Sequence, residues 1–215
     1  MVTGRFPQTV NVTTKAPQSN SWSRDLSPMR IGPVDTYREN DTLLQSVSVE
    51  VAWQYSKIFT HRNEGGSLVP LDFTDSNGYP NEKWFQWRDS AWNNSFFHWG
   101  HSQFEKHKKL VRRPFPKGSV VSSFYWDGKI LTHLEARREI YAKLYSDHVV
   151  STPGYQRLQS IFQRGDLAIF DFDGYDYEEL GISPDDTMRD LSHSWGHGLV
   201  LTLLLKGINP TTLCK

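Results

Sequence analysis

The sequence predicts a single domain of mixed helix and strand, and three observations support that class. A chain of 215 residues has the length of one domain with an appendage. A hydrophobic share of 37%, with 13% aromatic residues, supplies enough apolar side chains for a core and excludes a wholly disordered chain. Helix-period and strand-period patterns both occur along the chain.

The N-terminal segment, 1–28, is predicted to be a flexible arm. It is rich in Thr, Ser, Asn, Pro and Gln, so it can bury little apolar surface against the entropy of ordering. Docking of the arm on the body through Trp22 is the alternative. The domain itself is expected over 29–207, followed by a C-terminal tail at 208–215.

The first helix is expected over 47–59, and an insertion at about 61–117 follows it. The beginning of this segment is dense in Gly, Asn, Asp and aromatic residues and is longer than a structureless loop inside a compact domain. A strand is then expected at 119–126, with a tight turn at the Asp-Gly pair that follows.

Three further helices and one strand complete the predicted fold. A helix over 132–149 ends before Pro153 and Gly154, and a short helix covers 155–163. A strand at 166–173 leads into an acidic loop that runs to residue 190. A Leu-rich helix over 195–206 closes the domain.

Composition points to a cytoplasmic protein. Lys and Arg number 24 and Asp and Glu number 24, so net charge alone favours neither nucleic acid nor a membrane. The apolar run at 199–205 is too short to span a bilayer, and the N-terminus lacks the apolar core of a signal peptide. One cysteine, Cys214, cannot form an internal disulfide, which fits a reducing compartment.

The helix expected over 47–59 carries a polar stripe opposite its apolar arc. Glu50, Trp53, Gln54 and Lys57 fall on one side at helical spacing. A large aromatic ring beside a carboxylate makes a floor for a flat ligand and desolvates the carboxylate, as catalysis requires. A solvated face with an incidental Glu–Lys pair is the alternative.

The helix expected over 132–149 contains arginines where core residues belong. Arg137 lies near the centre of the buried arc and Arg138 at its margin. Because an unpaired buried charge is very costly, each needs a partner. An internal carboxylate such as Asp171 is one candidate, and a ligand phosphate held by the guanidinium fork is the other.

Two carboxylates emerge at the end of the strand expected at 166–173. Alternation puts Asp171 and Asp173 on one side. In α/β arrangements this end of a strand borders the ligand crevice, although two such Asp can also cap a helix or bind Arg137. The DxD spacing of phosphatases is present without that family's later Ser/Thr and Lys motifs.

Two histidine pairs have spacings that could bring two ligands each to one zinc ion. They are His98 with His101 and His193 with His197. Ordinary packing beside Trp and Gly is the favoured explanation, no Cys or Glu completes an HExxH pattern, and no metal site is predicted. The glycine-rich nucleotide motifs and GxSxG do not occur.

Charge is segregated along the chain. The stretch 105–117 holds six Lys or Arg against one Glu, directly after a region with four of the eight tryptophans, whereas 166–190 holds nine acidic residues and one Arg. Basic residues interleaved with aromatics suit nucleic acid, and a solvated surface or a private core of the insertion is the alternative. The residues expected to grip phosphates are Lys106, Lys108, Lys109, Arg112 and Arg113.

The string SVEVAWQYSKIF resembles the signature of NADAR-type N-glycosidase domains, approximately S-V-E-H-A-Y-Q-A-x-K-F. The likeness continues more loosely over about 30–207, through FYWDG, FQRGDLAIFD and SHSWGHG. SVExxWQxxK, LEARRxIY and LSH are also similar to a bacterial domain of unknown function. The chain departs from the NADAR pattern at Val51, where the family has His, and at Ser192, where it has Asp.

The resemblance implies an α+β, mainly helical domain that needs no cofactor and hydrolyses the C1'–N bond of a ribosyl or ADP-ribosyl nucleotide or of a modified nucleic-acid base. Glu50 would stabilise the oxocarbenium ion or activate water. Asp171 or Asp173, with Asp127 and Asp190 in reserve, would protonate the base or position water. A non-catalytic nucleotide or nucleic-acid binder, or a base-modifying enzyme acting on DNA, is the alternative.

The remaining residues of the expected site bind the substrate. Trp53 and Trp126 would stack on the base, and His193 would orient a carboxylate. Phosphate would be held by Arg137, Arg138 and Lys57. The binding set also includes Gln54, Tyr141 and Trp195.

Overall fold

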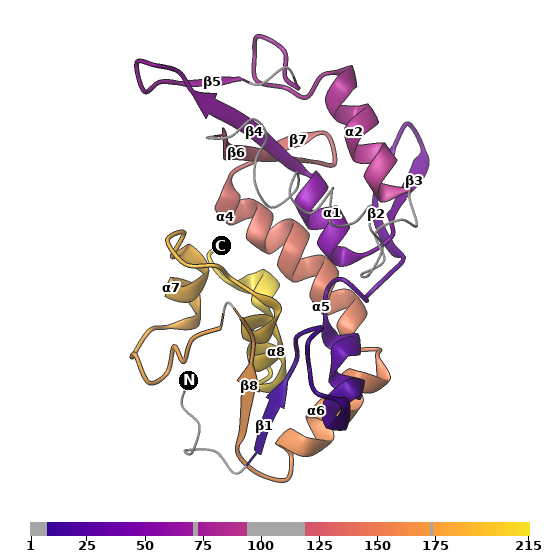
Figure 1. Cartoon of the computed structure of the whole chain (residues 1–215), viewed down its shortest axis with the longest axis vertical. Coiled ribbons are helices and arrows are strands. Elements are labelled where there is room, and N and C mark those ends of the chain that lie inside the picture. Colours follow the sequence, from indigo (N-terminus) through magenta and orange to yellow (C-terminus); the bar gives the residue numbers. More distant parts are fainter. Residues whose placement is uncertain (1–7, 71–72, 94–118, 173) are drawn as a thin grey trace. The chain divides into compact units, whose positions relative to one another are not determined.

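The computed structural model describes residues 8–70, 73–93, 119–172 and 174–215 and has a mixed α+β fold, as predicted (Figure 1). The chain divides into two compact units. The terminal unit combines Met1–Ile31 with Arg137–Lys215, and the central unit is Gly32–Ala136. The sequence predicted one domain over 29–207, whereas each of these units has a buried core of its own.

The central unit contains a four-stranded antiparallel sheet among its described residues. The strand order is β5 (Leu68–Pro70), β4 (Lys57–Arg62), β6 (Ser119–Trp126) and β7 (Lys129–Leu131). The other elements of this unit are β2 (Val34–Glu39) paired with β3 (Thr42–Ser46), α1 (Val49–Tyr55), α2 (Glu82–Trp92) and α4 (His133–Ala136).

The strand predicted at 119–126 is confirmed as β6, and the turn after it is also confirmed. Asp127 and Gly128 both have positive φ, +50° and +73°. Two consecutive positive φ values are the geometry of a tight hairpin turn, and Asp-Gly adopts it at low cost. The turn returns the chain as β7.

The helix predicted over 47–59 is shorter than expected. Ser48 caps α1 by accepting a hydrogen bond from the Val51 backbone N–H (3.2 Å), and the helix ends at Tyr55. Lys57 then begins β4, opposite Phe124 of β6. The β-branched and aromatic residues after Lys57 favour a strand, and pairing with a strand that is distant in the sequence outweighs the helical spacing.

Aromatic residues of the predicted insertion contribute to the core of the central unit. Trp84 and Trp92 of α2 are buried. Arg88, between them on the same helix, is also buried and pairs with Glu39 at 2.9 Å while it donates a hydrogen bond to Tyr37. These tryptophans therefore hold α2 in the fold and do not offer faces for stacking bases.

The terminal unit begins with a strand, so the predicted flexible arm is wrong for residues 8–28. β1 (Gln8–Asn11) pairs in parallel with β8 (Leu167–Phe170), and η1 (Gln18–Leu26) follows. Val10, Val12 and Leu26 are buried. The few apolar residues of this segment are thus used in the core, while Trp22 lies 4.8 Å from the Arg157 guanidinium, as the docking alternative expected.

The predicted helices of the later chain are present. The helix expected over 132–149 is formed by α4, the π-helical η3 (Arg137–Ala142) and α5 (Lys143–Val149), and Pro153 begins the next helix. The predicted short helix and Leu-rich helix are α6 (Pro153–Phe162) and α8 (His197–Leu205). Two elements were not predicted: α7 (Pro184–Arg189) lies in the expected acidic loop, and the 3-10 turn η4 (Pro210–Thr212) lies in the expected tail. No helix in the described ranges has both the length and the apolar character needed to cross a membrane.

Candidate functional site

The residues predicted for the site are divided between the two units. Those in the central unit are Glu50, Trp53, Gln54, Lys57, Trp126 and Asp127. Those in the terminal unit are Arg137, Arg138, Tyr141, Asp171, Asp190, His193 and Trp195. Asp173, His98, His101 and the basic residues Lys106, Lys108, Lys109, Arg112 and Arg113 lie outside the described residues.

The polar stripe of α1 is a connected set of side chains in the central unit. The Gln54 side-chain N–H₂ donates a hydrogen bond to Glu50 Oε1 (2.9 Å), and the Lys57 ammonium donates one to the Gln54 side-chain oxygen. All three side chains are half-buried. Lys57 is the first residue of β4 and not part of the helix as predicted. Because α1 ends only at Tyr55, the Lys57 side chain still lies next to those of α1.

The Trp53 indole lies beside these polar side chains and is packed against the sheet. Its indole stacks on Phe124 of β6, with ring centroids 4.5 Å apart, and meets His133 edge-on at 5.9 Å. The Lys57 ammonium lies 5.7 Å from the indole centroid. The indole is thus fixed in one orientation beside a carboxylate and an ammonium, and this combination can hold a polar, flat ligand.

Trp126 does not have the ligand-stacking role that was predicted for it. Only 9% of it is exposed, and it packs edge-on against Tyr37 at 5.0 Å and Trp92 at 5.8 Å. Trp126 is a core residue because both ring contacts are internal. Asp127, next in sequence, is exposed in the β6–β7 turn.

Arg137 is buried, as its helical position predicted, but its partners are different from either candidate. Its guanidinium donates hydrogen bonds to three backbone carbonyls, those of Met188 (2.9 Å), Asp190 (2.8 Å) and His193 (2.6 Å). Burial lowers its pKa, and Asp190 partly offsets this effect. Arg137 therefore fixes the loop after α7 and is not available to hold a phosphate.

Asp171 caps α8, and this contact disfavours the predicted acid–base role. It accepts hydrogen bonds from the backbone N–H of Gly198 (2.9 Å) and of Phe172 (2.8 Å), and it pairs with His197 at 3.1 Å. Burial acts to raise the pKa of Asp171, but the hydrogen bonds and charge of His197 and the two N–H groups lower it below its usual value. A carboxylate held in this way is a poor proton donor.

His193 and His197 do not form a joint metal site. His197 is buried, and its Nε2 donates to the Val12 carbonyl at 3.0 Å while Nδ1 faces Asp171. His193 is exposed and its Nδ1 contacts Asp190 at 2.5 Å, so His193 does meet a carboxylate as expected. No cluster of three metal-binding side chains occurs among the described residues.

Tyr141 and Trp195 are also core residues. Both are buried, and their ring centroids are 6.5 Å apart in an edge-on contact. The indole N–H of Trp195 donates to the Thr187 hydroxyl at 3.3 Å. These contacts lie inside the terminal unit and secure α7, so neither ring is placed to contact a substrate.

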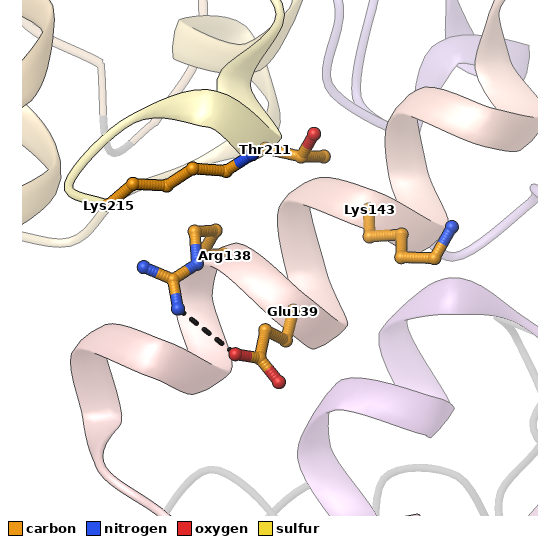
Figure 2. Close-up of a pocket in the computed structure, with 5 residues that line it drawn as sticks. All are labelled: Arg138, Glu139, Lys143, Thr211 and Lys215. Atoms are coloured by element: carbon orange, nitrogen blue, oxygen red, sulfur yellow. Dashed lines mark hydrogen bonds and ion pairs between the residues drawn. The ribbon is translucent and has the colours of Figure 1, made fainter.

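Arg138 lines a cavity of about 500 Å³ in the terminal unit (Figure 2). Its guanidinium donates to the Cys214 carbonyl (2.9 Å) and to Glu139 (3.0 Å). The full lining is Arg138, Glu139, Lys143, Thr211 and Lys215. The lining holds three cationic side chains and one carboxylate; Arg138 pairs with Glu139 and Lys143 pairs with Asp147 (2.7 Å), so the excess positive charge comes from Lys215.

The sequence pattern found only Arg138 among the residues that line the cavity. Thr211 and Lys215 belong to the segment that was predicted to be a tail outside the domain, and the fold brings them to Arg138 through the Cys214 carbonyl. The sequence signal was limited to the position of Arg138 at the margin of the buried helical arc, which does not show that the far C-terminal segment lies against it.

Comparisons of the chain with protein-family models, with curated proteins and with solved structures gave no significant match. The arrangement of the chain's own side chains is therefore the basis on which a function can be assigned. Two features are chemically the most suggestive: the Glu50 stripe in the central unit and the cationic cavity in the terminal unit.

Proposed function

We propose that the protein is an N-glycosidase that hydrolyses the C1'–N bond of a phosphorylated ribosyl or ADP-ribosyl nucleotide. The observation that carries the proposal is the set Glu50, Gln54, Lys57 and Trp53, which joins a half-buried carboxylate to a fixed indole on one surface. The resemblance of this same segment to the NADAR signature led to the hypothesis.

The chemistry needs a carboxylate near the sugar. Breaking the C1'–N bond develops positive charge on the sugar ring, and a carboxylate at Glu50 would stabilise it or take a proton from the attacking water. The hydrogen bond from Gln54 holds the carboxylate in one orientation. Asp127 is the other expected carboxylate of the central unit and is exposed in the β6–β7 turn, and we propose it as the group that protonates the base.

The cavity at Arg138 belongs to the terminal unit and is a separate feature from the Glu50 stripe, with a lining that suits an anion. A guanidinium group matches the oxygen geometry of phosphate, and lysine ammonium groups add charge without directional demand. Arg138 is held in place by the Cys214 carbonyl and Glu139, so little side-chain entropy would be lost when a phosphate binds.

The test is mass spectrometry of free bases and ribose phosphates after the purified protein is incubated with ribosyl nucleotides, ADP-ribosylated nucleotides and modified polymers. We expect Glu50→Gln to reduce base release about 100-fold or more, because the carboxylate acts only in the reaction step. The matched control is Glu82→Gln on α2, since Glu82 also accepts a hydrogen bond from a glutamine one helical turn later (Gln86, 3.1 Å).

Two outcomes would contradict the proposal. Equal base release by the wild type and Glu50→Gln would remove Glu50 from the mechanism. Binding of a nucleotide by the wild type without any release of base would instead identify a non-catalytic binder. Circular dichroism checks that Glu50→Gln and Glu82→Gln fold as the wild type does, which the comparison of their activities requires.

A further inference from the structure

Arg137 holds the end of α7 and the exposed loop that follows it through three hydrogen bonds. Arg137, buried in η3, donates hydrogen bonds to the carbonyls of Met188, Asp190 and His193 at 2.6–2.9 Å. The indole of Trp195 adds a contact to Thr187 of α7. Because one rigid guanidinium binds three carbonyls, the backbone of this loop is held in one conformation, and its side chains therefore have defined positions.

Three side chains of the loop form a hydrogen-bonded group at the surface. Asp190 Oδ1 accepts from the Ser192 hydroxyl (2.5 Å) and from the Ser192 backbone N–H (2.9 Å), and Asp190 Oδ2 contacts His193 Nδ1 at 2.5 Å. Hydrogen bonds from Ser192 and His193 lower the pKa of Asp190 to about 2. Asp190 is therefore a carboxylate at neutral pH.

This arrangement determines which ring nitrogen of His193 carries the proton. Nδ1 faces the Asp190 carboxylate, with the Ser192 oxygen at 3.2 Å as a second acceptor, so Nδ1 holds the proton in neutral histidine. Nε2 then presents a lone pair. No residue in the described part of the chain is hydrogen-bonded to Nε2, and 65% of the His193 side chain is exposed.

An aromatic ring lies beside the imidazole. The Tyr175 ring centroid is 5.6 Å from that of His193, with the planes tilted by 48°. A sugar has an apolar C–H face that packs on an aromatic ring and hydroxyl groups at its edge that need hydrogen-bond partners. An imidazole lone pair next to such a ring offers both contacts.

We propose that Asp190 and His193 form a sugar-binding dyad, in which Nε2 of His193 accepts the hydrogen bond of a sugar hydroxyl and Asp190 acts as a positioning residue. The Tyr175 ring supplies the apolar wall. The proposal stands without the glycosidase chemistry, because none of its residues belongs to the Glu50 stripe and sugar binding requires no bond to be cleaved.

The test uses imidazole ¹⁵N–¹H correlation spectra of the full-length protein. In the wild type we expect His193 to carry its proton on Nδ1. Addition of D-ribose 5-phosphate should shift the His193 Nε2 resonance in a saturable way, and inorganic phosphate at the same concentration should not. In Asp190→Asn the preference for Nδ1–H is lost and the sugar binds about threefold or more weakly, as expected when a charge-assisted hydrogen bond is removed.

The matched control is Asp25→Asn, because Asp25 is a surface carboxylate of the same unit that pairs with Arg30 at 3.3 Å and, among the described residues, has no contact with a histidine. It should leave both readouts unchanged. Three results would each overturn the proposal: a proton on Nε2 in the wild type, an equal shift with inorganic phosphate, or unchanged sugar binding in Asp190→Asn. The first result, the position of the His193 proton, is measured on the wild type alone and so does not depend on whether a variant folds.

Discussion

Arg137 and Arg138 are adjacent in sequence and have different roles. Arg137 gives its hydrogen bonds to three backbone carbonyls inside the terminal unit, whereas Arg138 lies at a cavity and bonds one carbonyl and one carboxylate. A buried arginine satisfied by neutral carbonyls keeps its charge without a salt bridge, and each carbonyl would lose its partner if Arg137 were removed.

We predict that Arg137→Met lowers the free energy of unfolding by about 3 kcal/mol, because it leaves three carbonyl groups without their donor. Arg137→Lys should recover little, since one ammonium cannot span three separated acceptors. Arg138→Met is the control and should cost about 1 kcal/mol, as its side chain is only half-buried. Urea denaturation measures the free energy of unfolding of all three variants. Equal losses of stability in Arg137→Met and Arg138→Met would contradict the interpretation of Arg137.

Sequence reasoning at this scale identified the buried Arg137 and gave helix capping as an alternative role for Asp171, but it did not identify the partners of Arg137. Helical spacing showed correctly that Arg137 is buried, and strand alternation drew attention to Asp171. Their partners, the carbonyls at the end of α7 and just after it and the Gly198 N–H of α8, are contributed by segments that lie much later in the sequence. Local pattern contains no information on such contacts.

Asp171 connects three elements of the terminal unit. It follows β8, accepts a hydrogen bond from the first turn of α8, and pairs with His197, whose other ring nitrogen donates to Val12 just after β1. Both ring nitrogens of His197 face oxygen acceptors. The geometry therefore favours an imidazolium ion paired with the Asp171 carboxylate.

This pair predicts a pH dependence of stability. Since the pKa of Asp171 is lowered in the folded state, its contribution is fully present above the unfolded value, about 4, and is lost as pH falls through the folded value. Asp171→Asn should cost about 3 kcal/mol at pH 7. The difference from the wild type should shrink below about pH 4. Denaturation at pH 7 and pH 3 tests this, and a pH-independent difference would contradict it.

Gly198 is required by the same contact. A Cβ atom at Gly198 would lie 2.7 Å from the Asp171 Cβ, whereas one at Gly174 would lie 3.4 Å from that same atom. We predict that Gly198→Ala destabilises the protein by about 2 kcal/mol although alanine favours helix. Gly174→Ala should stay within about 0.5 kcal/mol. Thermal unfolding compares them, and a Gly198→Ala variant as stable as the wild type would show that the Asp171 contact is not tight.

The elements themselves were predictable where the local signals agreed. Strand β6 and its Asp-Gly turn, and the helices over 133–149 and 153–162, carry consistent propensity, spacing and capping. The segment at 47–59 has helical spacing throughout, yet its second half becomes β4 because β6 offers a pairing partner. The polar stripe was nevertheless predicted correctly although the helix was predicted too long, because its first three residues lie within α1.

At the scale of the whole molecule, the terminal unit joins the two ends of the chain. β1 lies near the N-terminus and β8 in the last quarter of the sequence, yet the two strands pair in parallel, so the N-terminal segment belongs to the fold. Composition predicted a flexible arm there because apolar residues such as Val10, Val12 and Leu26 are few. These three residues are nevertheless buried, so a largely polar segment can form a strand of the fold when it pairs with one other strand, here β8.

The central unit is one continuous stretch of chain with its own sheet and its own buried aromatic core. We predict that a fragment of residues 32–136 folds alone, because its large buried side chains, including Trp84 and Phe124, contact residues within the same stretch. The fragment should give a cooperative urea transition and a near-ultraviolet circular dichroism signal, and Trp84→Ala should abolish both, since loss of a fully buried indole costs about 3–5 kcal/mol. A fragment that lacks the near-ultraviolet signal while the full-length chain shows it would mean that the central unit depends on the terminal unit for its structure.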